Sequence, residues 1–183
     1  MLDGAFDGTG RIVAGVDAMQ LGAATPCSEW DVRALINHVT SVVARMRFSA
    51  ARAAATPALE DEDFVANDPG PIFQRVAAAT LAAWSEPGAL DGTCVLPNGW
   101  DVPADIAARV NFVDTLVHGW DLAVATGRDA TIDPALAGAA LEFSQGFVTD
   151  ELRGPGRPFR APVAPPVGAS PTDELVAFLG RRT

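Results

Sequence analysis

Apolar residues recur at helical spacing along most of the chain. The clearest stretch begins near Ser28 and runs for four turns, with apolar positions at Val32, Leu35, Ile36, Val39, Val42, Val43 and Met46. Such a stripe predicts an amphipathic helix that buries one face. Ser28 with Asp31 three residues later is similar to a capping box, so we expect this helix to begin at Ser28.

Other helices are predicted from the same spacing and from the proline and glycine residues that mark their ends. We expect them over about residues 9–23, 68–84, 103–127 and 133–154, with a short one over 172–179. The first should bury Ile12, Val16 and Met19. The helix over residues 103–127 should bury one apolar stripe, made of Ile106, Val110, Val113, Val117, Trp120 and Val124. A short extended piece is expected around residues 93–96.

Four long amphipathic helices without a clear run of strands predict an all-α fold, a helical bundle. Residues 155–171 contain six of the 14 prolines, so this segment should be extended and lie on the surface. We expect residues 1–183 to form a single domain, in which the proline-rich segment and the short last helix (155–183) pack on the bundle.

Composition and charge exclude several classes of partner. The chain has 183 residues, 49% of them hydrophobic, and a formal net charge of -10. Such an acidic protein repels nucleic acid and anionic membrane surfaces. The first residues lack an apolar segment, so no signal peptide is expected. Two cysteines, Cys27 and Cys94, make no disulfide framework, which indicates a cytoplasmic protein with reduced thiols.

The chain has two histidines, and each lies in a predicted helix. Asp114 precedes His118 by four residues and Asp121 follows it by three, so all three side chains lie on one face. A metal ion can bind two groups at this spacing plus one from a facing helix, and His38 is the remaining histidine. Two imidazoles and a carboxylate suit zinc, nickel or non-haem iron. Spacing alone equally allows structural histidines and an ordinary ion pair between Asp114 and His118.

Two stretches resemble signatures of the DinB-like superfamily: Thr-Pro-Cys-Ser-Glu-Trp-Asp-Val-Arg-Ala-Leu-Ile-Asn-His over 25–38 and Val-Asp-Thr-Leu-Val-His-Gly-Trp-Asp-Leu-Ala-Val-Ala-Thr-Gly over 113–127. With Leu-Val-Ala-Phe-Leu-Gly-Arg over 175–181, they are similar to its actinobacterial metal-binding branch, which is related to the N-terminal domain of mycothiol-dependent maleylpyruvate isomerase. The resemblance implies a four-helix bundle with a divalent metal held by His38, Asp114 and His118. The isomerase has Glu in place of Asp114 and a further domain, so its own reaction is not implied.

Several residues near the proposed ligands are candidates for other roles. Arg45 and Asn111 lie one heptad from His38 and His118, so both are candidate substrate-binding residues, although a plain surface position suits Arg45 better. Asp121 could accept a proton from a ligand imidazole or pair with Arg128. Cys27 precedes His38 by eleven residues, which is roughly 16 Å along a helix, so it is expected to cap the helix rather than bind metal.

Three functions are compatible with these features. The first is a metal-dependent transferase or isomerase, in which a low-molecular-weight thiol such as mycothiol becomes a thiolate at the metal and attacks an electrophilic substrate. The second is metal-assisted hydrolysis. The third is a non-catalytic, metal-stabilised bundle used in stress response or protein interaction. No catalytic side chain stands out, and the oligomeric state, a homodimer included, is left open.

Overall fold

The computed structural model describes residues 1–53, 57–59, 61–66 and 68–182. It divides into two compact units, Met1–Arg128 and Asp129–Thr183. The expected single domain over residues 1–183, with residues 155–183 on the bundle, stays a prediction. No helix in the described ranges is long and apolar enough to cross a membrane.

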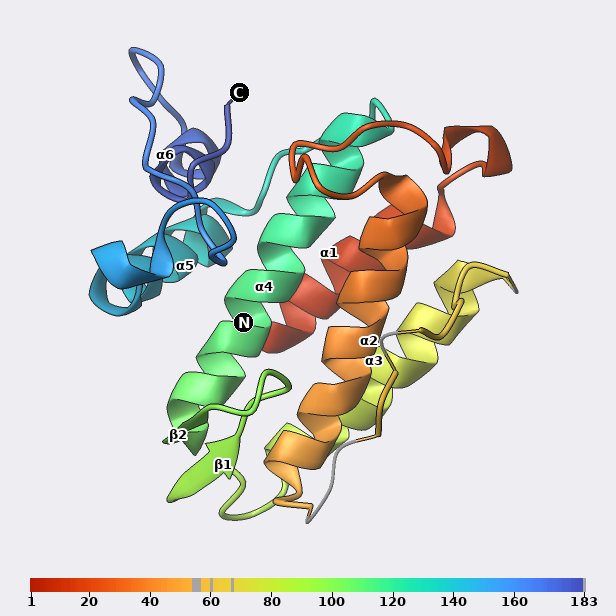
Figure 1. Ribbon diagram of the computed structural model, residues 1–183, viewed down its shortest axis with the longest axis vertical. Helices are drawn as coiled ribbons and strands as arrows, with labels where there is room; N and C mark the ends of the chain where they lie inside the picture. Colours follow the sequence, from red (N-terminus) through yellow and green to blue (C-terminus); the bar gives the residue numbers. More distant parts are fainter. Residues whose placement is uncertain (54–56, 60, 67, 183) are drawn as a thin grey trace. The chain divides into compact units, whose positions relative to one another are not determined.

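The first unit is a bundle of four helices, which confirms the predicted all-α fold (Figure 1). The helices are α1 (Leu2–Ala14), α2 (Val32–Ala50), α3 (Pro69–Ser85) and α4 (Ala104–Ala125). Helix α1 packs against α3 and α4, and α2 packs against the same two helices. Two short antiparallel strands, β1 (Thr93–Val95) and β2 (Asp101–Pro103), precede α4 and include the extended piece that was predicted.

Apolar side chains from three helices meet in the middle of this bundle. Leu35 and Val39 of α2, Phe73 of α3 and Leu122 of α4 are all fully buried in one cluster. Burying each such side chain contributes roughly 1.5–3 kcal/mol relative to leaving it exposed. The apolar stripe predicted for α2 is therefore the face that holds the bundle together.

The N-cap of helix α2 lies three residues later than the capping pattern predicted. The carboxylate of Asp31 accepts a hydrogen bond from the backbone N–H of Ala34 at 2.8 Å, so Asp31 is the N-cap and the prediction that Ser28 opens the helix was wrong. Residues 24–31 instead form an irregular segment, closed by an antiparallel bridge between Ala24 and Asp31. Because the segment folds back, helical geometry does not determine which residues its side chains contact.

The prediction for the first helix was wrong in position. Helix α1 ends at Ala14, and a short 3-10 helix, η1 (Ala18–Gln20), follows it. The side chain of Met19 is 96% exposed instead of buried. The buried face includes Thr9 and Gly10, which a search for apolar residues passes over. Small residues lie there because two neighbouring helices approach α1 closely. The Thr9 hydroxyl donates to the carbonyl of Thr115 in α4 at 2.9 Å, and a Cβ atom at Gly10 would lie 3.5 Å from the Phe73 ring of α3.

Helix α4 occupies the predicted range, but its buried surface is wider than one stripe. Val124 is 42% exposed, contrary to prediction, whereas several polar residues are buried: Asn111, Thr115, His118 and Asp121. The reason is that α4 packs against both α1 and α2, so its polar face also points into the bundle. Polar side chains inside the bundle need partners or ligands, so this polar face is the place in the bundle where a ligand could bind.

The second unit is built around α5 (Pro134–Phe147) and α6 (Pro171–Phe178), which pack against each other. Helix α5 ends at Phe147, earlier than the predicted residue 154. A 3-10 helix, η2 (Asp150–Leu152), follows it. The proline-rich segment between η2 and α6 contains no further helix, as predicted. The backbone N–H of Ile132 donates to the Thr172 hydroxyl at 3.1 Å and joins the start of this unit to α6.

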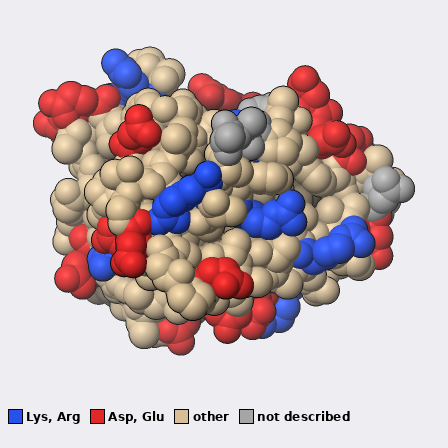
Figure 2. Space-filling model, turned by 90° about the horizontal axis from the view of Figure 1, so that it is seen from below, with Lys and Arg blue, Asp and Glu red and all other residues tan. Residues whose placement is uncertain are grey.

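Surface charge follows no single pattern on the face drawn in Figure 2. Arginine side chains and acidic side chains are interspersed there, with uncharged surface between them. The net charge of -10 is therefore not gathered into one continuous field on this face.

Candidate metal centre

The two histidines face each other between α2 and α4. Their ring centroids are 5.1 Å apart and the ring planes are nearly perpendicular, at 88°. One ligand atom each from His38, Asp114 and His118 lies within 4.8 Å of the other two. The structure thus brings together the three residues that the sequence predicted as ligands.

Each nitrogen of the buried His118 ring faces a carboxylate. Nε2 lies 3.5 Å from Oδ1 of Asp114, and Nδ1 lies 3.1 Å from Oδ2 of Asp121, which is fully buried. Burial lowers the pKa of His118, but Asp114 and Asp121 outweigh it and raise this pKa to about 9. Without a metal the ring is therefore an imidazolium that donates to both carboxylates.

His38 has the opposite electrostatic environment. Burial, together with the neighbouring His118, lowers the pKa of His38 to about 4, although Asp114 acts in the other direction. Its imidazole is consequently neutral at neutral pH. The neutral form is the one whose nitrogen lone pair can bind a metal ion.

An aromatic side chain from the irregular segment before α2 covers both histidines. The indole of Trp30 stacks on His38 with ring centroids 4.1 Å apart, and its centroid lies 5.8 Å from that of His118 in an edge-on arrangement. The Thr25 hydroxyl donates to the carbonyl oxygens of Cys27 and Trp30, which holds the segment in this shape. Helical periodicity cannot single out Trp30, since it lies outside the helices.

Cys27 lies near His118, although it was expected only to cap the helix. A ligand atom from each of Cys27, His118 and Asp121 lies within 4.8 Å of the other two. The expected distance of roughly 16 Å between Cys27 and His38 assumed a continuous helix between them. The chain before Val32 is not helical and folds back, so that assumption was wrong.

The remaining candidates have distinct surroundings. Arg45 donates through Nη2 to the carbonyl of Pro97, in the turn between β1 and β2, at 2.6 Å. Asn111 is fully buried, and neither polar atom of its amide has a hydrogen-bond partner among the residues that the structure describes. Cys94, in β1, is buried with an apolar cluster.

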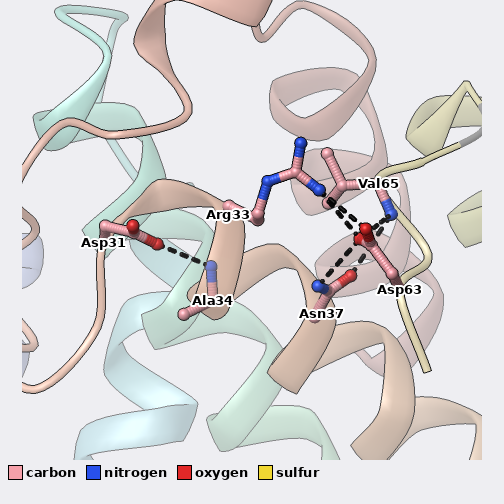
Figure 3. A network of polar contacts seen from close by, with 6 residues as sticks. All are labelled: Asp31, Arg33, Ala34, Asn37, Asp63 and Val65. Carbon is pink, nitrogen blue, oxygen red and sulfur yellow. Dashed lines mark hydrogen bonds and ion pairs between the residues drawn. The ribbon is translucent and has the colours of Figure 1, made fainter. Parts of the chain in front are cut away.

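Asn37, which precedes His38, points away from the two histidines. Its amide nitrogen donates to Oδ1 of Asp63 at 3.2 Å, and its amide oxygen accepts from the backbone N–H of Val65 (Figure 3). Arg33 donates to the same carboxylate at 2.8 Å. The bond from Asn37, reinforced by Arg33, lowers the pKa of Asp63. These contacts hold the segment around residues 63–65 against α2, which is a structural role.

These features define a four-helix bundle with two imidazoles and a carboxylate gathered between two of its helices. A family model, the mycothiol maleylpyruvate isomerase N-terminal domain, matches residues 2–123. The chain belongs to this family, and the matched range includes His38, Asp114 and His118. Two curated proteins, one from each of two strains of Mycobacterium tuberculosis, are 37% identical over 177 residues. The match covers 97% of this chain and 93% of each relative, and both relatives are named only as uncharacterized proteins.

Solved structures show the same fold. The crystal structure of mycothiol-dependent maleylpyruvate isomerase matches 76% of this chain and 65% of that enzyme, with a TM-score of 0.54 and 20% identity. A histidine-to-alanine mutant of the isomerase matches 82% of this chain and 69% of its own, with a TM-score of 0.61 and 17% identity. The chain therefore spans about two thirds of the isomerase's length.

Proposed function

We propose that the chain holds a divalent metal ion with His38, Asp114 and His118 and acts as a thiol-dependent transferase or isomerase of the mycothiol-using type. The observation that carries this proposal is the convergence of the three ligand atoms within 4.8 Å. Membership of a family described by a mycothiol-dependent isomerase supports the choice of thiol.

The donor set fits a divalent transition metal. Two imidazole nitrogens and one carboxylate oxygen are typical ligands of catalytic zinc, and nickel or non-haem iron accepts the same set. Three protein ligands leave coordination positions for a small molecule. An ion bound there supplies the acidity that converts a thiol to its nucleophilic thiolate at neutral pH.

The protein residues around this set orient and protect it. Asp121 contacts Nδ1 of His118, so it favours the tautomer with the proton on Nδ1 and leaves Nε2 available to the ion. Trp30 lies flat on His38 and excludes water from one face of that ring. Asp121 and Trp30 are positioning residues in this proposal, since neither is required to touch the thiol.

Asn111 and Arg45 are the side chains proposed to bind the polar part of the thiol. Asn111 lies two turns before His118 in α4, and its unpaired amide leaves both donors and an acceptor available to a ligand. Arg45 lies two turns after His38 in α2. Because α2 and α4 run in opposite directions (Figure 1), both residues lie toward the same end of the bundle from the histidines.

Calorimetric titration of the zinc-loaded chain with mycothiol tests the proposal. We expect binding of the free thiol and no comparable binding of its S-methyl derivative, which cannot form a thiolate. Asp114→Asn should weaken both zinc and thiol binding, whereas Asp129→Asn, an exposed control outside the site, should leave both unchanged. Equal binding of the two compounds would refute thiolate ligation. Turnover of an ester without any thiol would instead identify a metal-dependent hydrolase.

A further inference from the structure

We propose a second cation position in the first unit, formed by Cys27, His118 and Asp121, which takes a soft, thiophilic divalent ion such as cadmium. This position differs from the set proposed above because it includes a protein thiol. It shares only His118 with that set, and it does not depend on the chain binding an external thiol.

The geometry of the His118 ring separates the two positions. Nε2 faces Asp114, whereas Nδ1 lies 3.1 Å from the buried carboxylate of Asp121. One ligand atom from each of Cys27, His118 and Asp121 lies within 4.8 Å of the other two. The ring therefore has a carboxylate beside each nitrogen, and each carboxylate belongs to a different group of three ligands.

The chemistry of the three donors selects the ion. Thiolate, imidazole and carboxylate all bind divalent metal ions, and a thiolate favours soft ions such as cadmium over magnesium or manganese. The set formed by His38, Asp114 and His118 contains only nitrogen and oxygen donors. A soft ion should therefore prefer the position with Cys27, and a hard ion the position with His38.

Cys27 is held in place by its own backbone contacts. Its carbonyl oxygen accepts from the Thr25 hydroxyl at 3.0 Å and from the backbone N–H of Trp30 at 2.9 Å. Thr25 is buried, and the bridge between Ala24 and Asp31 closes the segment. A thiol on such a fixed segment needs little ordering when an ion binds, which favours binding.

The two positions exclude each other in the ordinary forms of histidine. A neutral imidazole offers one nitrogen lone pair and keeps a proton on the other nitrogen. An ion on Nδ1 leaves a proton on Nε2 that can donate to Asp114, and the reverse holds for an ion on Nε2. Occupancy of the position with Cys27 releases the thiol proton, because the thiolate is the ligand. One ion at a time is therefore expected per chain.

Cadmium titration of the metal-free full chain, followed by ultraviolet absorption, tests the second position. We expect a sulfur-to-cadmium charge-transfer band without any added thiol, and a cadmium NMR shift that indicates one sulfur ligand. Cys27→Ser and Cys27→Ala should both abolish the band. Cys94→Ser, the matched control at the other cysteine, should keep it. Circular dichroism of each variant checks that the helices are retained.

His38→Ala separates this inference from the proposed function. The variant should keep the sulfur-to-cadmium band, because His38 is not one of the three ligands, but it should lose manganese binding. Cadmium binding without the band, a band that survives in both Cys27 variants, or no cadmium binding at all would overturn the second position. None of these results would affect the set with His38 if zinc binding still required His38 and Asp114. Loss of that requirement would overturn the proposed function alone.

Discussion

The indole of Trp30 lies against the imidazole of His38, with the ring centroids 4.1 Å apart and the planes inclined by 28°. The contact joins the irregular segment before α2 to the face of α2 that points at α4. It removes water from one side of the imidazole, in accordance with the burial that lowers the pKa of His38 to about 4. Trp30 thus favours the neutral, metal-binding form of the ring.

Removing this indole should weaken metal binding without removing a ligand. Trp30→Ala should lower zinc affinity by about tenfold, as expected when a group that orients a ligand is lost. Trp30→Phe, which keeps an aromatic face, should restore most of the affinity. Trp100→Ala is the matched control, since Trp100 is 46% exposed in the turn before β2. Competition titration against a chelating dye measures all three; an unchanged Trp30→Ala variant would contradict the positioning role.

The two histidines should both be required for zinc binding. His38→Ala and His118→Ala should each lose stoichiometric zinc, measured by elemental analysis after gel filtration. Both variants should keep most of their helical circular dichroism, because the apolar cluster around Leu35 and Phe73 provides the bundle's packing. If both variants retained one zinc per chain, the ligands would have been assigned wrongly.

The contribution of the two histidines to the stability of the metal-free protein should be largest near pH 6.5, the ordinary pKa of histidine. The pKa of His38 is lowered to about 4, so its contribution is present above about pH 6.5 and is lost as the pH falls toward 4. The pKa of His118 is raised to about 9, so its contribution is full below about pH 6.5 and is lost as the pH rises toward 9.

Urea unfolding of chelator-treated protein across this pH range measures both effects. His118→Gln should remove the decline on the alkaline side and leave the acid side in place. Proton NMR titration of the imidazoles gives the same information directly. Two rings that both titrated near pH 6.5 would show that Asp114 and Asp121 do not hold the His118 proton.

Most of the bundle could be predicted from the sequence because its elements carry local signals. Helix α3 begins at Pro69 and α4 spans a long periodic stretch, and both lie within two residues of the expected bounds. Helix α1 could not be placed in this way. Its buried face includes Thr9, which lies against α4, and Gly10, which lies against Phe73 of α3. Their small size matters only because of these neighbours, which are not visible in a local pattern.

The candidate site also contains residues that could be predicted from local patterns and residues that could not. His38, Asp114 and His118 could be grouped because the i, i+4 pair lies on one helix and the chain has one other histidine. The places of Trp30 and Cys27 could not be inferred, since both depend on how residues 24–31 fold back before α2. Helical geometry placed Cys27 far away only because that segment was taken to be helical.

The close approach of α1 to α4 beside His118 gives the last prediction, which concerns stability. A Cβ atom at Gly119 would overlap the hydroxyl oxygen of Thr9 and come within 3.2 Å of its Cβ, so the Thr9 side chain or one of the two helices would have to move. Gly119→Ala should therefore destabilise the chain by about 1–3 kcal/mol in urea unfolding, the usual effect of overpacking. Gly8→Ala is the matched control in α1, because a Cβ there meets nothing within 4 Å, and it should leave stability unchanged or raise it by up to about 1 kcal/mol. The double variant Gly119→Ala with Thr9→Ala should recover part of the loss, since the overlapping hydroxyl is gone. Equal stability of the two single variants would show that the helices do not lie this close.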